Sequence, residues 1–263
     1  MGSIAVSTFA LIFWLNNQVG YLHGSRDPAA PVPIPARSLG MVLGNGSASA
    51  PVQIEVFLEL LCPDSFQAWT TLKRLSRTYD AAKVRIVIHQ FPLPYHSNGF
   101  VVTQTFFQVA HVKPDMASAY MEQIFRSMGG YSTGSTMDNT PNAVLRHLAA
   151  RMSALTGMDK EQILSNHDRY YGTAITAWKY GARRGVAGTP WHFVNGVELS
   201  QNGESLSLED YRAIIDPLMR RNDVSPTHSF LIVDGPTNAT PFASLVSHQV
   251  VLILLTVSSL VVL

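Results

Sequence analysis

A nearly continuous apolar run, VQIEVFLELL at residues 52–61, leads directly into Cys62 and Pro63. Such a run is typical of a central β-strand that is covered on both faces. Proline suits the first position of a helix because its fixed φ matches helical geometry, and apolar residues then recur every three or four positions over 66–79. A second apolar run, KVRIVIHQ at 83–90, follows. The order strand, helix, strand predicts a βαβ unit with parallel strands and a right-handed crossover.

Further patterned segments extend this unit on both sides. The run RSLGMVLGNGSA at 37–48 is interpreted as a strand that pairs with the first strand of the βαβ unit across the turn between them. Amphipathic helical segments fill the stretch from 99 to 180. The run GVAGTPWHFVNGVEL at 185–199 predicts a turn followed by a hairpin, whose tight turn is Asn195-Gly196.

Polar residues mark where several helices begin. Thr140 and Asp159 each stand at a predicted N-cap, where a side-chain oxygen accepts from a backbone N–H of the first turn. Ser207 with Asp210 has the spacing of a capping box and predicts the start of the last helix. Pro217 is expected to kink or divide that helix.

Composition limits the classes of function. The 263 residues are 46% hydrophobic, enough to bury a full core in one domain with an insertion or in two small domains. A formal net charge of +1, without runs of Lys and Arg interleaved with aromatics, argues against nucleic-acid binding. Cys62 is the only cysteine, so the chain has no internal disulfide and no cysteine set for zinc. We expect no metal site and a fold held together by packing.

Both ends of the sequence are typical of targeting segments. Residues 1–24 contain an apolar stretch of signal-peptide length, with an uncleaved anchor or a wrong start site as the alternatives. The apolar tail at 250–263 follows a polar spacer and the small-residue cluster that begins at Asn238, an order typical of a glycosylphosphatidylinositol anchor signal. A single membrane helix is the alternative for the tail. We therefore expect a chain of the secretory pathway, held at the extracellular face of the plasma membrane, with glycosylation sequons at Asn45 and Asn238.

Several motifs occur in a recognisable order. CPDS at 62–65 ends the first strand of the βαβ unit, FPLPYH at 91–96 ends the second, and the helical stretch, GTPWHFVNG at 188–196 and a closing helix follow. Together they resemble the DsbA-like branch of the thioredoxin fold, over about residues 51–221. The resemblance implies an α/β, thioredoxin-like fold with an inserted all-helical subdomain.

On this interpretation the chain divides into consecutive segments. They are a signal peptide at 1–24, a Pro/Ala/Gly-rich linker and first strand at 25–50, the first half of the thioredoxin fold at 51–98, the helical insertion at 99–180, the second half of the fold at 181–222, a linker or spacer at 223–249, and the hydrophobic tail at 250–263.

The resemblance also implies roles for particular residues. In the DsbA-like family the first cysteine of CPxC is the nucleophile, and the proline of the TP pair is cis and faces it. Cys62 and Pro190 match these positions, and Pro63 and Thr189 are the matching substrate-binding residues. Ser65 stands where the family has its second cysteine. Serine cannot resolve a mixed disulfide, although its hydroxyl can donate a hydrogen bond to a thiolate at Cys62.

A site with one thiol favours thiol–disulfide exchange of the isomerase or reductase type, through a mixed disulfide at Cys62. The expected partners are thiol- or disulfide-containing proteins, with glutathione as a candidate co-substrate and no bound cofactor. Two alternatives stay open: a non-catalytic peptide-binding module, and a glutathione-dependent transferase or isomerase similar to the kappa class. The fold does not decide whether the chain is an enzyme.

The environment of Cys62 is a further expectation. A cysteine between a strand and a helix, followed by proline, is expected to be exposed and reactive, with a buried cysteine kept for packing as the alternative. The resemblance brings His89, His96 and His192 nearest to the site. Each is interpreted as an ordinary core or surface histidine, because no metal-ligand spacing or catalytic triad pattern recurs.

Overall fold

The structure is a computed structural model that describes residue 35, residues 39–199 and residues 205–223. The predicted signal peptide at 1–24, the apolar tail at 250–263 and the sequon at Asn238 lie outside the described residues. So does the predicted spacer, apart from Asp223. In the described part of the chain, no helix is both long enough and apolar enough to cross a bilayer.

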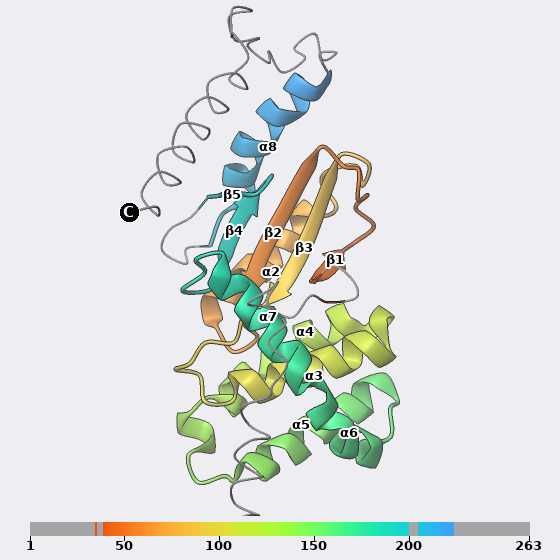
Figure 1. Cartoon of the computed structure of the whole chain (residues 1–263), viewed down its shortest axis with the longest axis vertical. Helices are drawn as coiled ribbons and strands as arrows, with labels where there is room; N and C mark the ends of the chain where they lie inside the picture. Colours follow the sequence, from red (N-terminus) through yellow and green to blue (C-terminus); the bar gives the residue numbers. More distant parts are fainter. Residues whose placement is uncertain (1–34, 36–38, 200–204, 224–263) are drawn as a thin grey trace, which may run out of the picture. The chain divides into compact units, whose positions relative to one another are not determined.

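The described chain forms a mixed sheet with helices on both faces (Figure 1). The strands are β1 (Met41–Leu43), β2 (Val52–Leu58), β3 (Val84–Gln90), β4 (Trp191–Val194) and β5 (Val197–Glu198). The α-helices are α2 (Pro63–Leu75), α3 (Gly99–Val112), α4 (Ala117–Ser127), α5 (Pro141–Thr156), α6 (Lys160–Asn166), α7 (Tyr171–Arg183) and α8 (Leu208–Asp223). Short 3-10 helices are η1 (Pro114–Met116), η2 (Met128–Tyr131), η3 (Gly134–Thr136) and η4 (His167–Tyr170).

The strand order is β1-β3-β2-β4-β5. Strands β2 and β3 are parallel, from Val52 opposite Val84 to Leu58 opposite Gln90, which confirms the predicted βαβ unit. The prediction that the first two strands pair is wrong. Strand β1 runs antiparallel to β3, with Met41 opposite Ile88. The physical reason is that β4 occupies the other edge of β2, so β1 joins the sheet at the free edge of β3.

The two faces of the sheet bury different clusters. On one face, apolar residues of β2 pack against α2 and α8 in the main core, which includes Val56, Trp69 and Tyr211. On the other face, Phe57 packs with Cys62 and with Tyr180 of α7 in a smaller cluster. Figure 1 shows α7 on one side of the sheet and α2 on the other. Strand β2 is therefore covered on both faces, as its apolar run predicts.

Local signals for helix starts and turns are confirmed. The Thr140 side chain accepts a hydrogen bond from the Ala143 N–H, and Asp159 accepts one from the Gln162 N–H. The Asn195-Gly196 turn joins β4 to β5, and both residues have positive φ, 50° and 81°, as tight hairpin turns require.

Two helical predictions need correction or refinement. The last helix begins after the capping box, where Ser207 and Asp210 exchange hydrogen bonds, but α8 continues through Pro217 without being divided. Within the helical stretch predicted from 99 to 180, residues 160–183 form two α-helices, because η4 separates α6 from α7.

A charged network fixes α7 to the sheet. Glu55 Oε2 of β2 lies 3.0 Å from His89 Nε2 of β3, and it accepts hydrogen bonds from Tyr180 (3.2 Å) and Arg184 (2.6 Å) at the end of α7. The Arg184 guanidinium also lies 4.1 Å from the ring centroid of Phe193 on β4. The hydrogen bond from His89, together with Arg184, lowers the pKa of Glu55 from 4.5 to about 2 against the opposing effect of burial.

We expect Glu55→Gln to lower the free energy of unfolding by about 2 kcal/mol at pH 7, because it removes the charge from a partly buried network of hydrogen bonds. The pKa of Glu55 is lower in the fold than in the unfolded chain, so the ionised carboxylate stabilises the fold above about pH 4.5. That contribution is lost as the pH falls toward 2. Urea unfolding at pH 7 and pH 3 measures the difference between variant and wild type, which should be smaller at pH 3. Glu198→Gln, at an exposed position of β5, is the control and should change little at either pH; an equal loss in both variants would contradict the assignment.

Candidate functional site

Cys62 lies where β2 turns into α2. It occupies the N-cap position with extended backbone dihedrals, and Pro63 is the first residue of the helix, as the sequence predicts. The Cys62 N–H donates to the Glu59 carbonyl at 3.2 Å, and the Cys62 carbonyl accepts from the Phe66 N–H at 3.2 Å. The backbone therefore holds the sulfur at the beginning of a helix that starts directly from the central strand.

Pairing between β2 and β4 brings a second segment to this sulfur. Phe57 is opposite Trp191 in the antiparallel register, so the residues just before β4 lie beside the end of β2. The Thr189–Pro190 peptide bond is cis, as the resemblance implies. The Cys62 thiol donates a hydrogen bond to the Thr189 carbonyl at 3.3 Å. The structure thus brings Cys62, which matches the family's nucleophile, next to Thr189, the residue before the cis-proline.

The expectation that Cys62 is exposed is wrong. Its relative exposure is 5%, because it packs in the cluster of Phe57, Phe91, Leu93 and neighbouring apolar side chains. Pro63 beside it is exposed. A thiol in this position must gain access to solvent or to a partner before it can react.

Ser65 does not make the hydrogen bond that its hydroxyl could donate to Cys62. Ser65 is fully buried, and its hydroxyl oxygen accepts the Glu59 N–H at 3.1 Å. No hydrogen bond joins it to the Cys62 sulfur, although both residues lie in the described part of the chain. The Ser65 hydroxyl therefore ties the first turn of α2 to the end of β2.

Two buried polar atoms near the thiol have no hydrogen-bond partner among the described residues. They are Thr189 Oγ1 and Trp191 Nε1, on either side of Pro190. Buried polar atoms are normally paired, so such atoms beside a candidate site mark places where a bound group can make hydrogen bonds.

The three histidines have different surroundings. His89 belongs to the Glu55 network, and Tyr211 of α8 lies 2.8 Å from His192 Nδ1, so both are core histidines with partners. His96 instead contacts the carboxylate of Glu59 through its Nδ1. Only His96 is thereby connected to the elbow that carries Cys62.

Glu59 is a residue that the sequence analysis missed. It is fully buried three positions before Cys62, and its Oε1 accepts the Leu93 N–H at 3.0 Å while its Oε2 contacts His96. Burial raises the pKa of Glu59 from 4.5 to about 7, and the bonds from Leu93 and His96 only partly oppose this. The available signal was an acidic residue in the run LELL at 58–61, with apolar residues on both sides.

The loop after β3 and the start of α3 close over this carboxylate. Leu93 and His96 lie on that loop, and a Cβ atom added at Gly99 would lie 2.2 Å from Glu59 Oε1. Burial raises the pKa of Tyr95 on the same loop, and the charges of Cys62, Glu59 and Asp64 act in the same direction. Cys62, Glu59 and the 91–99 loop therefore form one continuous site. In the described residues, no group of three or more His, Cys, Asp or Glu could hold a metal ion.

Comparisons with known proteins agree with this architecture. The sequence model of the family described as Thioredoxin (Thioredoxin_4) matches residues 39–217. Among solved structures, a putative protein-disulfide isomerase from Pseudomonas syringae matches with 21% identity and a TM-score of 0.56, over 67% of this chain and 97% of that chain. BdbD from Bacillus subtilis in its oxidised form matches with 15% identity and a TM-score of 0.53, over 69% and 93%. Alpha-DsbA1 from Wolbachia pipientis matches with 16% identity and a TM-score of 0.56, over 74% and 96%. No curated protein sequence matches.

We expect the free energy of unfolding to fall by up to about 3 kcal/mol as the pH rises from about 4.5 to 7, through Glu59 alone. The pKa of Glu59 is higher in the fold than in the unfolded chain, so the folded state holds an extra proton over this range. Glu59→Gln keeps an acceptor for the Leu93 N–H and should remove this part of the pH dependence. Urea unfolding of both proteins between pH 4.5 and 8 measures it, and parallel curves would show that Glu59 is already ionised in the fold.

Proposed function

The chain belongs to the thioredoxin family and has the DsbA-like form of its fold, and from this premise we propose that it carries out thiol–disulfide exchange through Cys62. The observation that carries the proposal is the contact between the Cys62 sulfur and the Thr189 carbonyl, 3.3 Å apart, next to the cis peptide bond of Pro190. A sulfur at the start of a helix, facing the backbone of an adjacent loop, is placed to form a bond with a second sulfur whose chain lies along that loop.

The proposed reaction needs one protein thiol and one external thiol. The Cys62 thiolate attacks one sulfur of a substrate disulfide, a bond forms between these two sulfurs, and the other substrate sulfur leaves and takes up a proton. A thiol from the substrate or from glutathione then attacks the mixed disulfide and releases Cys62. If the second thiol belongs to the substrate, the result is isomerisation. If it is glutathione, the substrate leaves as a mixed disulfide with glutathione, and a second glutathione is needed to reduce it and form oxidised glutathione. Ser65 is not a thiol, so it cannot attack the mixed disulfide and release the substrate from Cys62.

The unpaired atoms beside Pro190 support binding of an extended chain at this site. Thr189 Oγ1 and Trp191 Nε1 are buried without a partner among the described residues, and the Thr189 carbonyl is bonded only to the thiol. A substrate backbone that offers both donors and acceptors would satisfy these groups. When its sulfur bonds to Cys62, the thiol no longer donates to Thr189, so this carbonyl becomes available for a substrate N–H.

Non-catalytic peptide binding is the second candidate function, and the burial of Cys62 favours it. A thiol with 5% relative exposure is well packed, and a buried free cysteine is often only part of the core. In that case the loop around Pro190 would hold a chain without forming a covalent bond. The two candidates differ in whether a mixed disulfide forms.

We expect the wild type to form mixed disulfides with a disulfide-containing peptide that persist until an external thiol is added. Cys62→Ala should form none, because it lacks the sulfur. Ser65→Cys should form the same adduct and then release the peptide without external thiol, because the second sulfur can attack the first. Non-reducing gels and mass spectrometry of the three proteins measure these outcomes.

The Ser65→Cys variant needs a stability measurement as its control. Ser65 is fully buried and accepts the Glu59 N–H, so the change should cost about 1–2 kcal/mol, more than an exposed substitution would. Persistence of the adduct in a folded Ser65→Cys protein would contradict the geometry of the elbow. Identical patterns for wild type and Cys62→Ala would leave peptide binding as the function.

We also propose that the mature chain is held at the outer face of a membrane by a lipid attached near Asn238. The support is the order of small residues, polar spacer and apolar tail in the sequence. The sequon at Asn45 is exposed in the turn after β1, where a glycan can be accommodated.

We expect a phosphatidylinositol-specific phospholipase to release the protein from intact cells. Recovery of peptides from 250–263 in the membrane-bound protein would show a membrane helix instead.

A further inference from the structure

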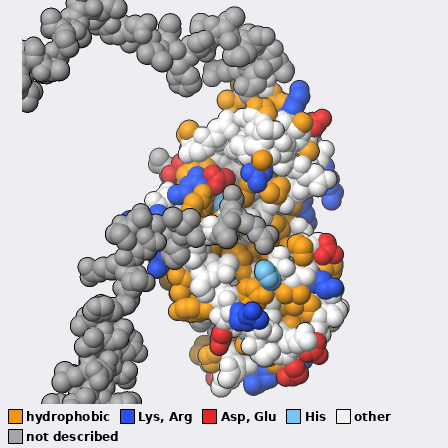
Figure 2. Space-filling model, turned by 45° about the vertical axis from the view of Figure 1, so that its right-hand side comes forward, with side chains coloured by type: hydrophobic (Ala, Val, Ile, Leu, Met, Phe, Trp, Pro, Cys, Tyr) orange, Lys and Arg blue, Asp and Glu red, His pale blue; other side chains and the backbone are white. Residues whose placement is uncertain are grey.

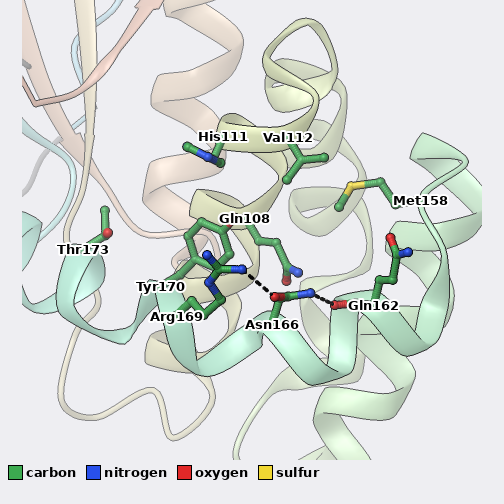
Figure 3. A pocket seen from close by; sticks show the side chains of 9 residues that line it. All are labelled: Gln108, His111, Val112, Met158, Gln162, Asn166, Arg169, Tyr170 and Thr173. Carbon is green, nitrogen blue, oxygen red and sulfur yellow. Dashed lines mark hydrogen bonds between the residues drawn. The ribbon is translucent and has the colours of Figure 1, made fainter.

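The helical insertion contains a cavity that is separate from the Cys62 site. Its volume is about 460 Å³, and its lining comes from α3, α6, η4 and α7 together with Met158 (Figure 3). None of the residues around Cys62 or Pro190 lines it. This volume is in the range of sites that bind small molecules. Because the walls are helices of one packed subdomain, the cavity is formed before any ligand enters.

An exposed arginine, Arg169, lines this cavity and bonds to a neighbouring side chain. Arg169 Nη1 donates to Asn166 Oδ1 at 2.9 Å, and Asn166 Nδ2 in turn donates to the Gln162 carbonyl at 2.9 Å. Figure 3 shows this chain of hydrogen bonds beside the cavity. The lining contains no Asp or Glu. Among the described residues no carboxylate forms an ion pair with Arg169, and such a guanidinium favours an anionic ligand group such as a carboxylate or a phosphate.

A buried acceptor on α3 lines the same cavity, beside Asn166 (Figure 3). Gln108 of α3 is 2% exposed, and its Nε2 donates to the Ile163 carbonyl at 3.2 Å, which fixes the orientation of the amide. Its Oε1 is buried and has no hydrogen-bond partner among the described residues. An unpaired buried acceptor is destabilising, so a ligand that brings an N–H or O–H group to it would gain affinity.

We propose that this cavity binds a small carboxylic acid that has an apolar body and an N–H donor, as an N-acylated amino acid does. The carboxylate binds Arg169, the N–H donates to Gln108 Oε1, and the apolar body packs against Val112 and Met158. A free amino acid fits less well, because its ammonium group would find Arg169 and His111 in the lining and no carboxylate to balance it.

The test is a titration of the full-length protein with N-acetyl-L-leucine, in which binding is measured by ligand-observed saturation-transfer NMR. We expect saturable binding, and at least tenfold weaker binding of N-acetyl-L-leucinamide, which lacks the negative charge. Arg169→Gln should weaken binding of N-acetyl-L-leucine at least tenfold. Arg146→Gln, an exposed arginine of α5 in the same subdomain that does not line the cavity, is the matched control and should bind as the wild type does.

A second variant tests the hydrogen bond from the ligand N–H to Gln108 Oε1. Gln108→Met has a similar volume and removes Oε1, and its melting curve checks that it folds. The variant should bind N-acetyl-L-leucine more weakly than the wild type does. It should bind 4-methylpentanoate as the wild type does, because that compound has the carboxylate and the apolar body without the N–H. A titration with a hexapeptide that ends in leucine shows whether the carboxylate comes from a polypeptide C-terminus: tighter binding than that of N-acetyl-L-leucine indicates a polypeptide, and weaker binding indicates a free acid. Equal binding of the acid and its amide, or equal effects of Arg169→Gln and Arg146→Gln, would overturn the proposal.

Discussion

The pairing of β2 with strands on both of its edges is the constraint on which the rest of the structure depends. On one edge it runs parallel to β3, and on the other it runs antiparallel to β4. The antiparallel register places the start of β4 beside the end of β2, which is where α2 begins. A thiol at the end of one strand and a carbonyl before the other therefore meet, although Cys62 and Thr189 are 127 positions apart in the sequence. The long helical insertion between them does not disturb this contact, because the sheet fixes it.

The same strand shows how strongly the surroundings of a carboxyl group decide its charge. Glu55 points to a face where His89 and Arg184 bond to it, and its pKa falls to about 2. Glu59, four residues later, is fully buried with one backbone N–H and His96, and its pKa rises to about 7. The first glutamate holds α7 against the sheet as an ionised group. The second changes its charge near neutral pH, three residues before Cys62.

The sequence predicted those parts of the fold that depend on neighbouring residues. The βαβ unit, the N-caps at Thr140 and Asp159 and the hairpin turn at Asn195 all arise from local periodicity and backbone preference. The partner of β1 was predicted wrongly because it depends on which sheet edge is still free once β4 has paired with β2. The burial of Cys62 was missed for a related reason, because it depends on how the 91–99 loop and the residues around Pro190 close over the elbow.

The serine at position 65 changes both the chemistry and the mechanics of the elbow. An oxygen is a stronger hydrogen-bond acceptor than a sulfur, so Ser65 holds the Glu59 N–H more firmly than a cysteine would. The N–H of Cys62 donates to the carbonyl of the same Glu59, so the two bonds fix the turn from both sides. Ser65 thus stiffens the turn that carries Cys62. With no second cysteine in the chain, the fate of any mixed disulfide at Cys62 is decided by a thiol that arrives from outside, and its lifetime depends on the concentration of that thiol.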